Sequence, residues 1–242
     1  MKTYPRTKNY DPQWIEANQM WANPILLMEA LCDNLDLRPG MKVLDMGCGK
    51  GLTSIFLAKE YGVTVFANDL WIDPTDNLRA FEKAGVADKV FPIRAEAHAL
   101  PYANGFFDAA VSVGSYHYFG ACEHYFPVTY SKLVKAGGQF GIVCPGFTQE
   151  YEHGFPPGYN HLFADDMFTF HSNQWWRKLW EKTGMVEITA CYDMEDALTR
   201  SLWVAQENDD WKVLASDPEN HVAMVVMAAI KKGHRKNIYA QG

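Results

Sequence analysis

The sequence predicts a doubly wound α/β fold, in which a mostly parallel β-sheet is covered by helices on both faces. Apolar segments with the period of a strand alternate with segments that have the period of a helix, from residue 42 to residue 144. Glycines follow the helical segments, as they do where helices end in the left-handed conformation. The 242 residues, 48% of them apolar, are enough to bury the core of one large domain.

The predicted elements follow one another in a regular order. The strand KVLDM (42–46) precedes the helix LTSIFLAKEYG (52–62), in which Leu52, Ile55 and Phe56 lie on one face. A second helix is expected at 74–85, between Pro74 near its start and Gly85 at its end. The remaining strands of this half are expected at 63–69, 89–95, 106–114 and 138–144.

The apolar pattern of the sequence changes after the fifth strand. Residues 145–170 are rich in Pro, Gly and aromatic residues and have no clear period, which indicates an ordered insertion or lid. Residues 1–38 precede the first strand and are expected to form an N-terminal helical cap on the same single domain. Two helices and two strands complete the prediction, at 172–184 and 195–208 and at 185–192 and 221–232.

Composition and charge exclude several classes of protein. The net charge is −7 and there is no Lys/Arg-rich run, so a nucleic-acid or anionic-membrane surface is not expected. The apolar segment Val222–Ile230 has nine residues, against about 20 in a membrane-spanning helix. The first residues lack the apolar stretch of a secretory signal, which favours a cytoplasmic protein. The five cysteines contain no C-x-x-C pair, and the sequence predicts neither a disulfide framework nor a metal site.

The segment KVLDMGCGKG (42–51) is a glycine-rich turn directly after the first strand. A phosphate-binding Walker A loop requires Ser or Thr after its Gly-Lys pair, but Gly51 follows Lys50 here. The dinucleotide fingerprint requires G-x-G-x-x-G, whereas Gly47, Gly49 and Gly51 form G-x-G-x-G. The turn is therefore expected to hold a different kind of ligand.

Two acidic residues indicate which ligand this is. Asp45 ends the first strand two residues before Gly47, where its carboxylate would repel a diphosphate and stabilise a cation. Asp69 closes the second strand, 18 residues after Gly51, at a position suited to accept the hydroxyls of a ribose. Each acid alone could simply cap a turn. Together they describe a nucleoside with a positive, phosphate-free tail, which matches S-adenosylmethionine.

The motifs VLDMGCGKG, FANDLW, RAEAHALPYANGFFDAAVSV and LVKAGGQFGIV resemble those of class I S-adenosylmethionine-dependent methyltransferases. They are most similar to the small-molecule branch that includes the quinone-biosynthesis methyltransferases. The resemblance covers residues 40–145 and implies a seven-stranded sheet in the order 3-2-1-4-5-7-6, with the last strand antiparallel. It also implies an enzyme that transfers a methyl group to a small-molecule acceptor.

The resemblance assigns cofactor-binding roles to individual positions. Glu96 stands where the family usually has an aspartate near the adenine amino group. Tyr10 and Trp14, in the segment before the first strand, are the candidates for covering the cofactor. The other matching positions are Asp45, Gly47, Cys48 and Gly49 at the methionine end, Asp69 at the ribose, Leu70, Trp71 and Ala97 at the adenine, and Gly114 and Ser115 at the end of the fourth strand.

Methyl transfer needs a general base only for some acceptors. His117 follows the fourth strand, in the region that faces the methyl group in this fold, and is the candidate base. Alternatively, His117 begins the next helix and packs structurally. Trp175, Trp176 and Trp180 form an apolar stripe that indicates core or a subunit contact, so a homo-oligomer is one option.

Two other functions remain open from the sequence. One is a nicotinamide-dependent oxidoreductase on a related sheet, which Asp45 and the glycine spacing disfavour. The other is a protein that binds S-adenosylmethionine without turnover, since an intact cofactor site would look the same in sequence.

Overall fold

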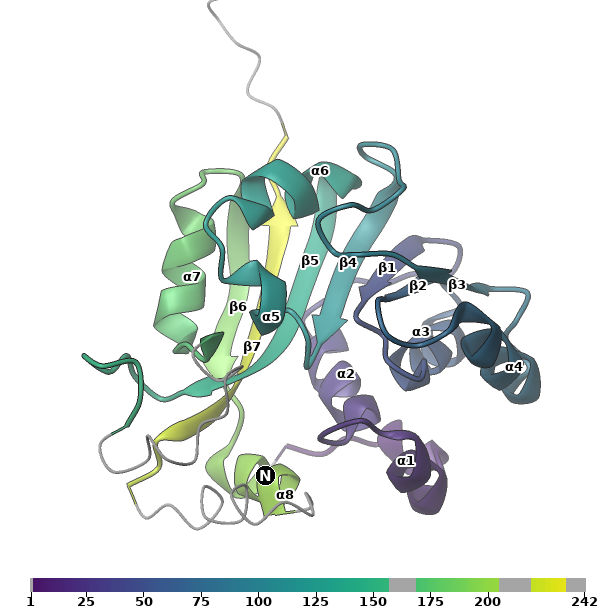
Figure 1. Ribbon diagram of the computed structural model, residues 1–242, viewed down its shortest axis with the longest axis horizontal. Helices are drawn as coiled ribbons and strands as arrows, with labels where there is room; N and C mark the ends of the chain where they lie inside the picture. The colour runs from purple at the N-terminus through teal and green to yellow at the C-terminus, as the bar shows by residue number, and fades with distance from the viewer. Residues whose placement is uncertain (1, 157–168, 205–218, 234–242) are drawn as a thin grey trace, which may run out of the picture.

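The computed structural model describes residues 2–156, 169–204 and 219–233, and its centre is a seven-stranded mixed sheet (Figure 1). The strands are β1 (Lys42–Met46), β2 (Thr64–Asp69), β3 (Val90–Arg94), β4 (Phe107–Val113), β5 (Val134–Phe147), β6 (Val186–Asp193) and β7 (Val222–Lys231). Their order is β3-β2-β1-β4-β5-β7-β6. The first five strands run parallel, and β7 is antiparallel to both β5 and β6. The predicted sheet order and the antiparallel last strand are confirmed.

Helices cover both faces of this sheet and bury two separate apolar clusters. One cluster lies under α2, α3 and α4, and the other under the π-helical turn η2 and α7. The helices are α1 (Pro12–Asn18), α2 (Pro24–Cys32), α3 (Leu52–Tyr61), α4 (Pro74–Ala84), α5 (His117–Gly120), α6 (Ser131–Leu133), α7 (Asn173–Glu181) and α8 (Asp196–Val204), together with the 3-10 turn η1 (Thr7–Asn9) and the π-helical turn η2 (Phe126–Tyr130). The doubly wound architecture follows, because each face of the sheet needs its own apolar cover.

Local chemistry fixes the ends of several helices. The side chain of Asp73 accepts a hydrogen bond of 2.8 Å from the N–H of Thr75 and caps α4. Ser172 caps α7 in the same way through Trp175. Gly62 and Gly85 end α3 and α4 with φ of 64° and 71°, a conformation that glycine adopts without steric cost. These helix ends agree with the sequence prediction.

The largest difference from the prediction is at β5, which runs on to Phe147 and so takes in the start of the expected insertion. Gly146 makes this extension possible, because a Cβ there would lie 2.3 Å from the carbonyl oxygen of His171. Residues 157–168 of the expected lid lie outside the described residues, as do 205–208 of the last expected helix. The division of the chain into cap, domain and lid stays a prediction.

The tryptophan stripe of α7 belongs to the core. Trp176 and Trp180 are fully buried, and Trp180 stacks on Phe126 with 4.3 Å between ring centroids. Trp175 is partly exposed and stacks on His171 at 3.6 Å. Burial of the stripe inside one chain accounts for its composition, and a homo-oligomer stays a prediction.

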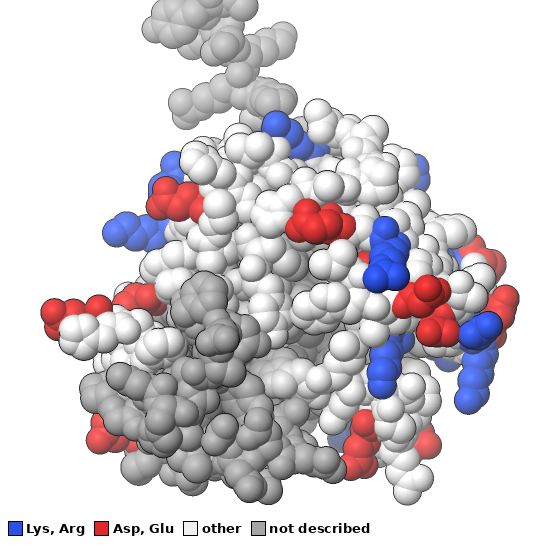
Figure 2. Space-filling view, viewed as in Figure 1, with Lys and Arg blue, Asp and Glu red and all other residues white. Residues whose placement is uncertain are grey.

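The surface shows charges of both signs. Figure 2 shows Lys and Arg interspersed with Asp and Glu on the visible face of the described residues. Among the described helices, none has the length and apolar character needed to cross a bilayer.

Candidate cofactor site

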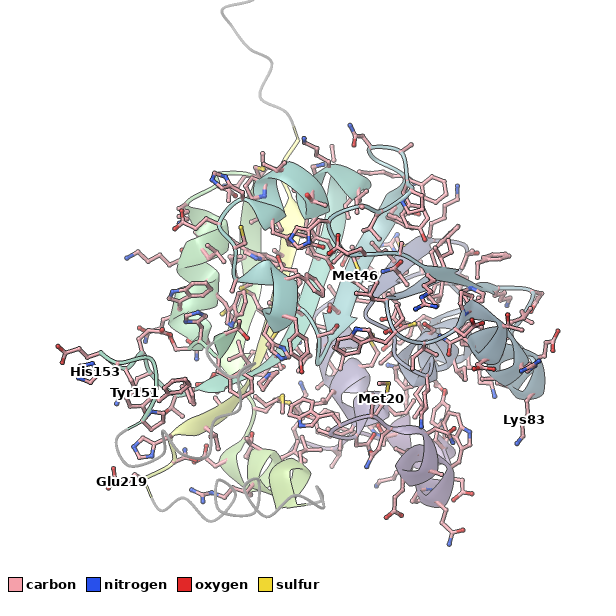
Figure 3. All side chains as sticks on the ribbon, in the orientation of Figure 1. Met20, Met46, Lys83, Tyr151, His153 and Glu219 are labelled. Atoms are coloured by element: carbon pink, nitrogen blue, oxygen red, sulfur yellow. The ribbon has the colours of Figure 1, made fainter. Side chains whose placement is uncertain are left out.

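A cleft of about 380 Å³ opens at the carboxyl ends of β1, β2 and β4. This edge, beside the point where the strand order reverses, is where doubly wound sheets bind ligands, and the volume suits a small molecule. Met46 at the end of β1 and Met20 from the segment between α1 and α2, both labelled in Figure 3, line the cleft. The other described lining segments lie within residues 18–27, 47–53, 68–71, 95–98 and 113–119.

The glycine turn forms the floor of the cleft, and its amide groups are already engaged. The N–H groups of Gly47 and Cys48 donate to the carbonyl oxygen of Asn68, at 2.8 and 3.0 Å. The N–H of Gly49 donates to Oδ2 of Asp69 at 2.8 Å. A phosphate cradle needs such amides to point at the ligand. The turn therefore offers a phosphate no donor at these three positions.

Asp69 joins the turn to the segment that follows β2. Its Oδ1 accepts hydrogen bonds from the N–H groups of Trp71 (2.8 Å) and Ile72 (3.0 Å), while Oδ2 accepts from Gly49. The residue is buried yet lines the cleft. Two carboxylate oxygens offer about four acceptor positions, so one remains for a hydroxyl of a ligand.

Asp45 lies beneath the turn and is not among the described lining residues, which corrects the expectation that it faces the ligand. It is fully buried, and Oδ2 accepts hydrogen bonds of 2.6 Å from the hydroxyls of Thr53 and Ser54 in the first turn of α3. Burial raises the pKa of Asp45 to about 6, against these two hydrogen bonds. Its Oδ1 has no hydrogen-bond partner among the described residues, so a cation bound nearby would stabilise its ionised form.

Two serines complete the floor next to Gly114. The hydroxyls of Ser112 and Ser115 lie 2.8 and 2.9 Å from the carbonyl oxygen of Met46, and 2.8 Å from each other. Two hydroxyl hydrogens cannot supply three hydrogen bonds, so both hydrogens are used within this group. Ser115 therefore presents only acceptor capacity to the cleft, where it suits an ammonium group.

The expected adenine side of the cleft contains an acidic residue paired with a histidine. Glu96 accepts hydrogen bonds from the backbone N–H of His98 (2.9 Å), and its other oxygen lies 2.7 Å from Nδ1 of that ring. These bonds with His98 lower the pKa of Glu96. Ala97 lines the cleft between them, and its carbonyl oxygen accepts a hydrogen bond of 3.3 Å from the hydroxyl of Tyr125.

Leu70 and Trp71 lie at the mouth of the cleft and are 46% and 68% exposed. The ring of Trp71 meets Tyr118 edge to face, with 6.2 Å between centroids. The structure thus brings together all the predicted cofactor residues except Asp45, Tyr10 and Trp14.

Tyr10 and Trp14, which were expected to cover the cofactor, are not among the described residues that line the cleft. The hydroxyl of Tyr10 donates to Glu60 at 3.1 Å, its ring packs against Phe56, and Trp14 stacks on the other side. The same N-terminal segment reaches the cleft further along the chain, at Met20 and Trp21, which sequence reasoning did not single out.

His117 is buried at the start of α5 and is likewise absent from the described cleft lining. Burial lowers the pKa of His117 to about 3, and its Nδ1 has no partner among the described residues. Its ring packs against Phe170, with 5.5 Å between centroids. A base must reach the proton that it removes. The geometry supports the alternative role, in which His117 packs at a helix start.

Asn77 was not predicted, although it holds the turn in place. From α4 its Nδ2 donates to the carbonyl oxygen of Gly49 at 3.0 Å and lies 3.7 Å from Sγ of Cys48. A Cβ at Gly51 would lie 2.4 Å from the ring of Phe81, one helical turn further on. Only the spacing of Asn77 and Phe81, four residues apart, offered a signal in the sequence.

Within the described part of the chain, no group of three or more His, Cys, Asp and Glu side chains is placed to hold a metal ion.

The sheet order, with a glycine turn after β1 and a carboxylate after β2, defines the class I methyltransferase fold. The family model described as mycolic acid cyclopropane synthetase matches residues 16–156, more than half of the chain. The chain therefore belongs to the mycolic acid cyclopropane synthetase family, a group within the class I S-adenosylmethionine-dependent methyltransferases.

The chain is also similar to curated relatives with different acceptors in their names. It is 35% identical over 130 residues to a probable fatty acid methyltransferase of Pseudomonas putida, covering 53% of this chain and 32% of that protein. It is 29% identical over 126 residues to the cyclopropane-fatty-acyl-phospholipid synthase of Escherichia coli strain K12, covering 51% and 31%. The match thus spans about a third of the length of these relatives.

Solved structures share the fold at low sequence identity. A geranyl diphosphate methyltransferase in complex with S-adenosylmethionine superposes with a TM-score of 0.74 at 18% identity, covering 86% of both chains. A phosphoethanolamine N-methyltransferase of Haemonchus contortus, also bound to S-adenosylmethionine, gives 0.74 at 17% identity, covering 91% of this chain and 56% of that one. These likenesses concern the fold alone.

Proposed function

We propose that this chain transfers the methyl group of S-adenosylmethionine to a small-molecule acceptor. The observation that carries the proposal is the cleft itself, where the N–H groups of Gly47, Cys48 and Gly49 are engaged within the protein while Asp69 and Ser115 offer acceptors. Such a site suits a ligand with hydroxyl and ammonium donors. The family membership supports the same cofactor. A nicotinamide-dependent oxidoreductase is disfavoured, because its dinucleotide carries a diphosphate.

The predicted cofactor residues divide the cleft into three parts under this proposal. Asp69 would hold the ribose hydroxyls, and Glu96 would lie at the adenine. Gly47 and Ser115 would lie beside the amino-acid end. Asp45, two residues before Gly47 and fully buried with one unpartnered oxygen, would add negative potential behind the turn when it is ionised. The residues present therefore fit the cofactor.

The bound cofactor supplies a methyl group on a positively charged sulfur that is already activated for displacement. The chain's own contribution is to position the acceptor in line with that methyl group and to exclude water. The buried floor at Met46 and the ring of Trp21, which lies over Gly114, close the inner side of the cleft. No side chain is assigned as a general base.

The mouth of the cleft favours an acceptor with an apolar portion. Met20, Trp71 and Tyr118 all line it and are 52%, 68% and 46% exposed. Exposed apolar side chains around one cleft are typical of ligand-binding sites. Within this proposal, an apolar acceptor would fit the quinone-biosynthesis-like branch that the motifs resemble, and that finer assignment stays a prediction.

Two measurements test this function. Thermal unfolding with S-adenosylhomocysteine, S-adenosylmethionine and NAD in parallel is expected to show stabilisation by the first two alone. Transfer of a labelled methyl group to a panel of apolar alcohols, phenols, amines and unsaturated lipids would then identify the acceptor. Stabilisation by NAD alone would contradict the proposal. Cofactor binding with no transfer to any acceptor would instead favour a non-catalytic binding protein.

A further inference from the structure

The amino-acid end of the cofactor carries a carboxylate, and the cleft must stabilise it. Three of the turn amides are engaged, because Gly47 and Cys48 donate to Asn68 and Gly49 donates to Asp69. The donors left on this side are the neutral N–H groups at the start of α3. Ser115 offers the cleft no hydrogen, since the hydroxyl hydrogens there are used within the floor. A cationic side chain would add a charge-assisted partner that neutral N–H groups do not supply.

Lys50 is the one Lys or Arg among the described residues that line the cleft. It lies in the glycine turn between Gly49 and Gly51, next to the expected methionine end. Its side chain is exposed, and it forms no ion pair with any described residue. Because Lys50 lines the cleft and is exposed, its ammonium group would be available to an anion bound there.

Nearby arginines are occupied elsewhere. Nε of Arg94, at the end of β3, donates to the carbonyl oxygen of Leu70 at 3.0 Å. Arg79 on α4 pairs with Asp76, with 3.0 Å between Nη1 and Oδ1. Neither arginine is among the described lining residues.

We propose that Lys50 binds the α-carboxylate of the cofactor and so distinguishes ligands with a complete amino-acid end from nucleosides that lack the carboxylate. This inference rests on the proposed function, because it concerns the same cleft. The acidic floor would attract the ammonium and sulfonium groups, while Lys50 on the rim would pair with the one negative group of the ligand.

The test is calorimetry with two ligands that differ only in the carboxylate, S-adenosylhomocysteine and its decarboxylated analogue S-adenosyl-3-thiopropylamine. Lys50→Met is expected to weaken binding of S-adenosylhomocysteine about two- to fivefold in 0.15 M salt, as for other exposed ion pairs. The loss should shrink in 1 M salt, where such pairs are screened. The decarboxylated ligand should bind the variant at least as tightly as the wild type.

Lys59→Met is the matched control, because Lys59 is exposed on α3 and is not among the described lining residues. It removes the same charge and should leave both affinities unchanged. Equal weakening of the two ligands by Lys50→Met, or no weakening of either, would overturn the assignment of Lys50. Failure of the wild type to bind S-adenosylhomocysteine at all would instead overturn the proposed function and, with it, this inference.

Discussion

Adding a single methyl group at Gly47 tests how tightly the floor of the cleft is packed. Gly47 has φ of 70°, and a Cβ there would lie 2.1 Å from Oγ and 2.5 Å from Cβ of Ser115. Gly85, at the end of α4, has nearly the same φ of 71° but no atom within 4 Å of an added Cβ. The pair of substitutions Gly47→Ala and Gly85→Ala therefore separates backbone strain from the steric clash.

The left-handed conformation costs an alanine about 1–2 kcal/mol at either position. At Gly47 the clash must also displace Ser115, whose hydroxyl then leaves the carbonyl oxygen of Met46, and a lost hydrogen bond costs about 1 kcal/mol more. We therefore expect Gly47→Ala to lower the free energy of unfolding by about 2–3 kcal/mol and Gly85→Ala by about 1–2 kcal/mol.

Urea unfolding of both variants measures these free energies, and calorimetry with S-adenosylhomocysteine measures the cleft. Only Gly47→Ala should weaken binding, because Gly47 and the displaced Ser115 line the cleft, whereas Gly85 is not among the described lining residues. Adding Ser115→Gly to Gly47→Ala removes both clashing atoms and should recover part of the lost stability. Equal destabilisation by the two alanines, with unchanged binding, would refute the argument that Ser115 lies against the turn.

Three further substitutions address single side chains of the site. Asp69→Asn places an amide against backbone N–H donors, so we expect calorimetry to show at least about tenfold weaker binding of S-adenosylhomocysteine and urea unfolding to show a loss of about 1–3 kcal/mol. Burial raises the pKa of Asp45 to about 6 from 3.8, so the folded state keeps a proton that the unfolded state loses. Urea unfolding should show the stability of the wild type, relative to Asp45→Asn, falling by about 2 kcal/mol between pH 4 and 6 and by about 3 kcal/mol in all between pH 3 and 7, with no further change above that. A constant difference would contradict this. Because burial lowers the pKa of His117 to about 3, His117→Leu should leave the pH profile of methyl transfer unchanged between pH 6 and 8, and loss of a titration in that range would restore His117 as a base.

The sequence predicted the elements of the sheet well because their signals are local. Alternating apolar patterns marked the strands, and Gly62 and Gly85 marked the helix ends with the left-handed backbone that favours glycine. The extension of β5 was not predictable in this way. Its last residues pair with β7, more than 70 positions later in the chain, so no local pattern could set where it ends.

The candidate site was predicted where a motif and a strand end coincide, as at Gly47 and Asp69. Tyr10 and Trp14 were expected to cover the cofactor, but the described lining of the cleft contains Trp21 instead. Glu29 of α2 accepts hydrogen bonds from the N–H groups of Arg6 (2.9 Å) and Thr7 (2.6 Å), and these bonds fix the path of the N-terminal segment. That contact spans more than 20 residues, so the sequence could indicate that aromatic residues are near the cleft but not which of them faces it.

Asp45 was predicted to favour a cation by facing the ligand, a position that the described cleft lining does not give it. Its carboxylate lies under the turn, held by Thr53 and Ser54, and does not line the cleft. The preference for a cation stays a prediction, and it is supported because the N–H groups of Gly47, Cys48 and Gly49 are engaged within the protein and the hydroxyl of Ser115 donates to Met46. A ligand must then bring its own hydrogen-bond donors to this floor. A diphosphate has none, whereas a ribose and an ammonium group together supply them, and this difference discriminates between the two cofactors more directly than the glycine spacing does.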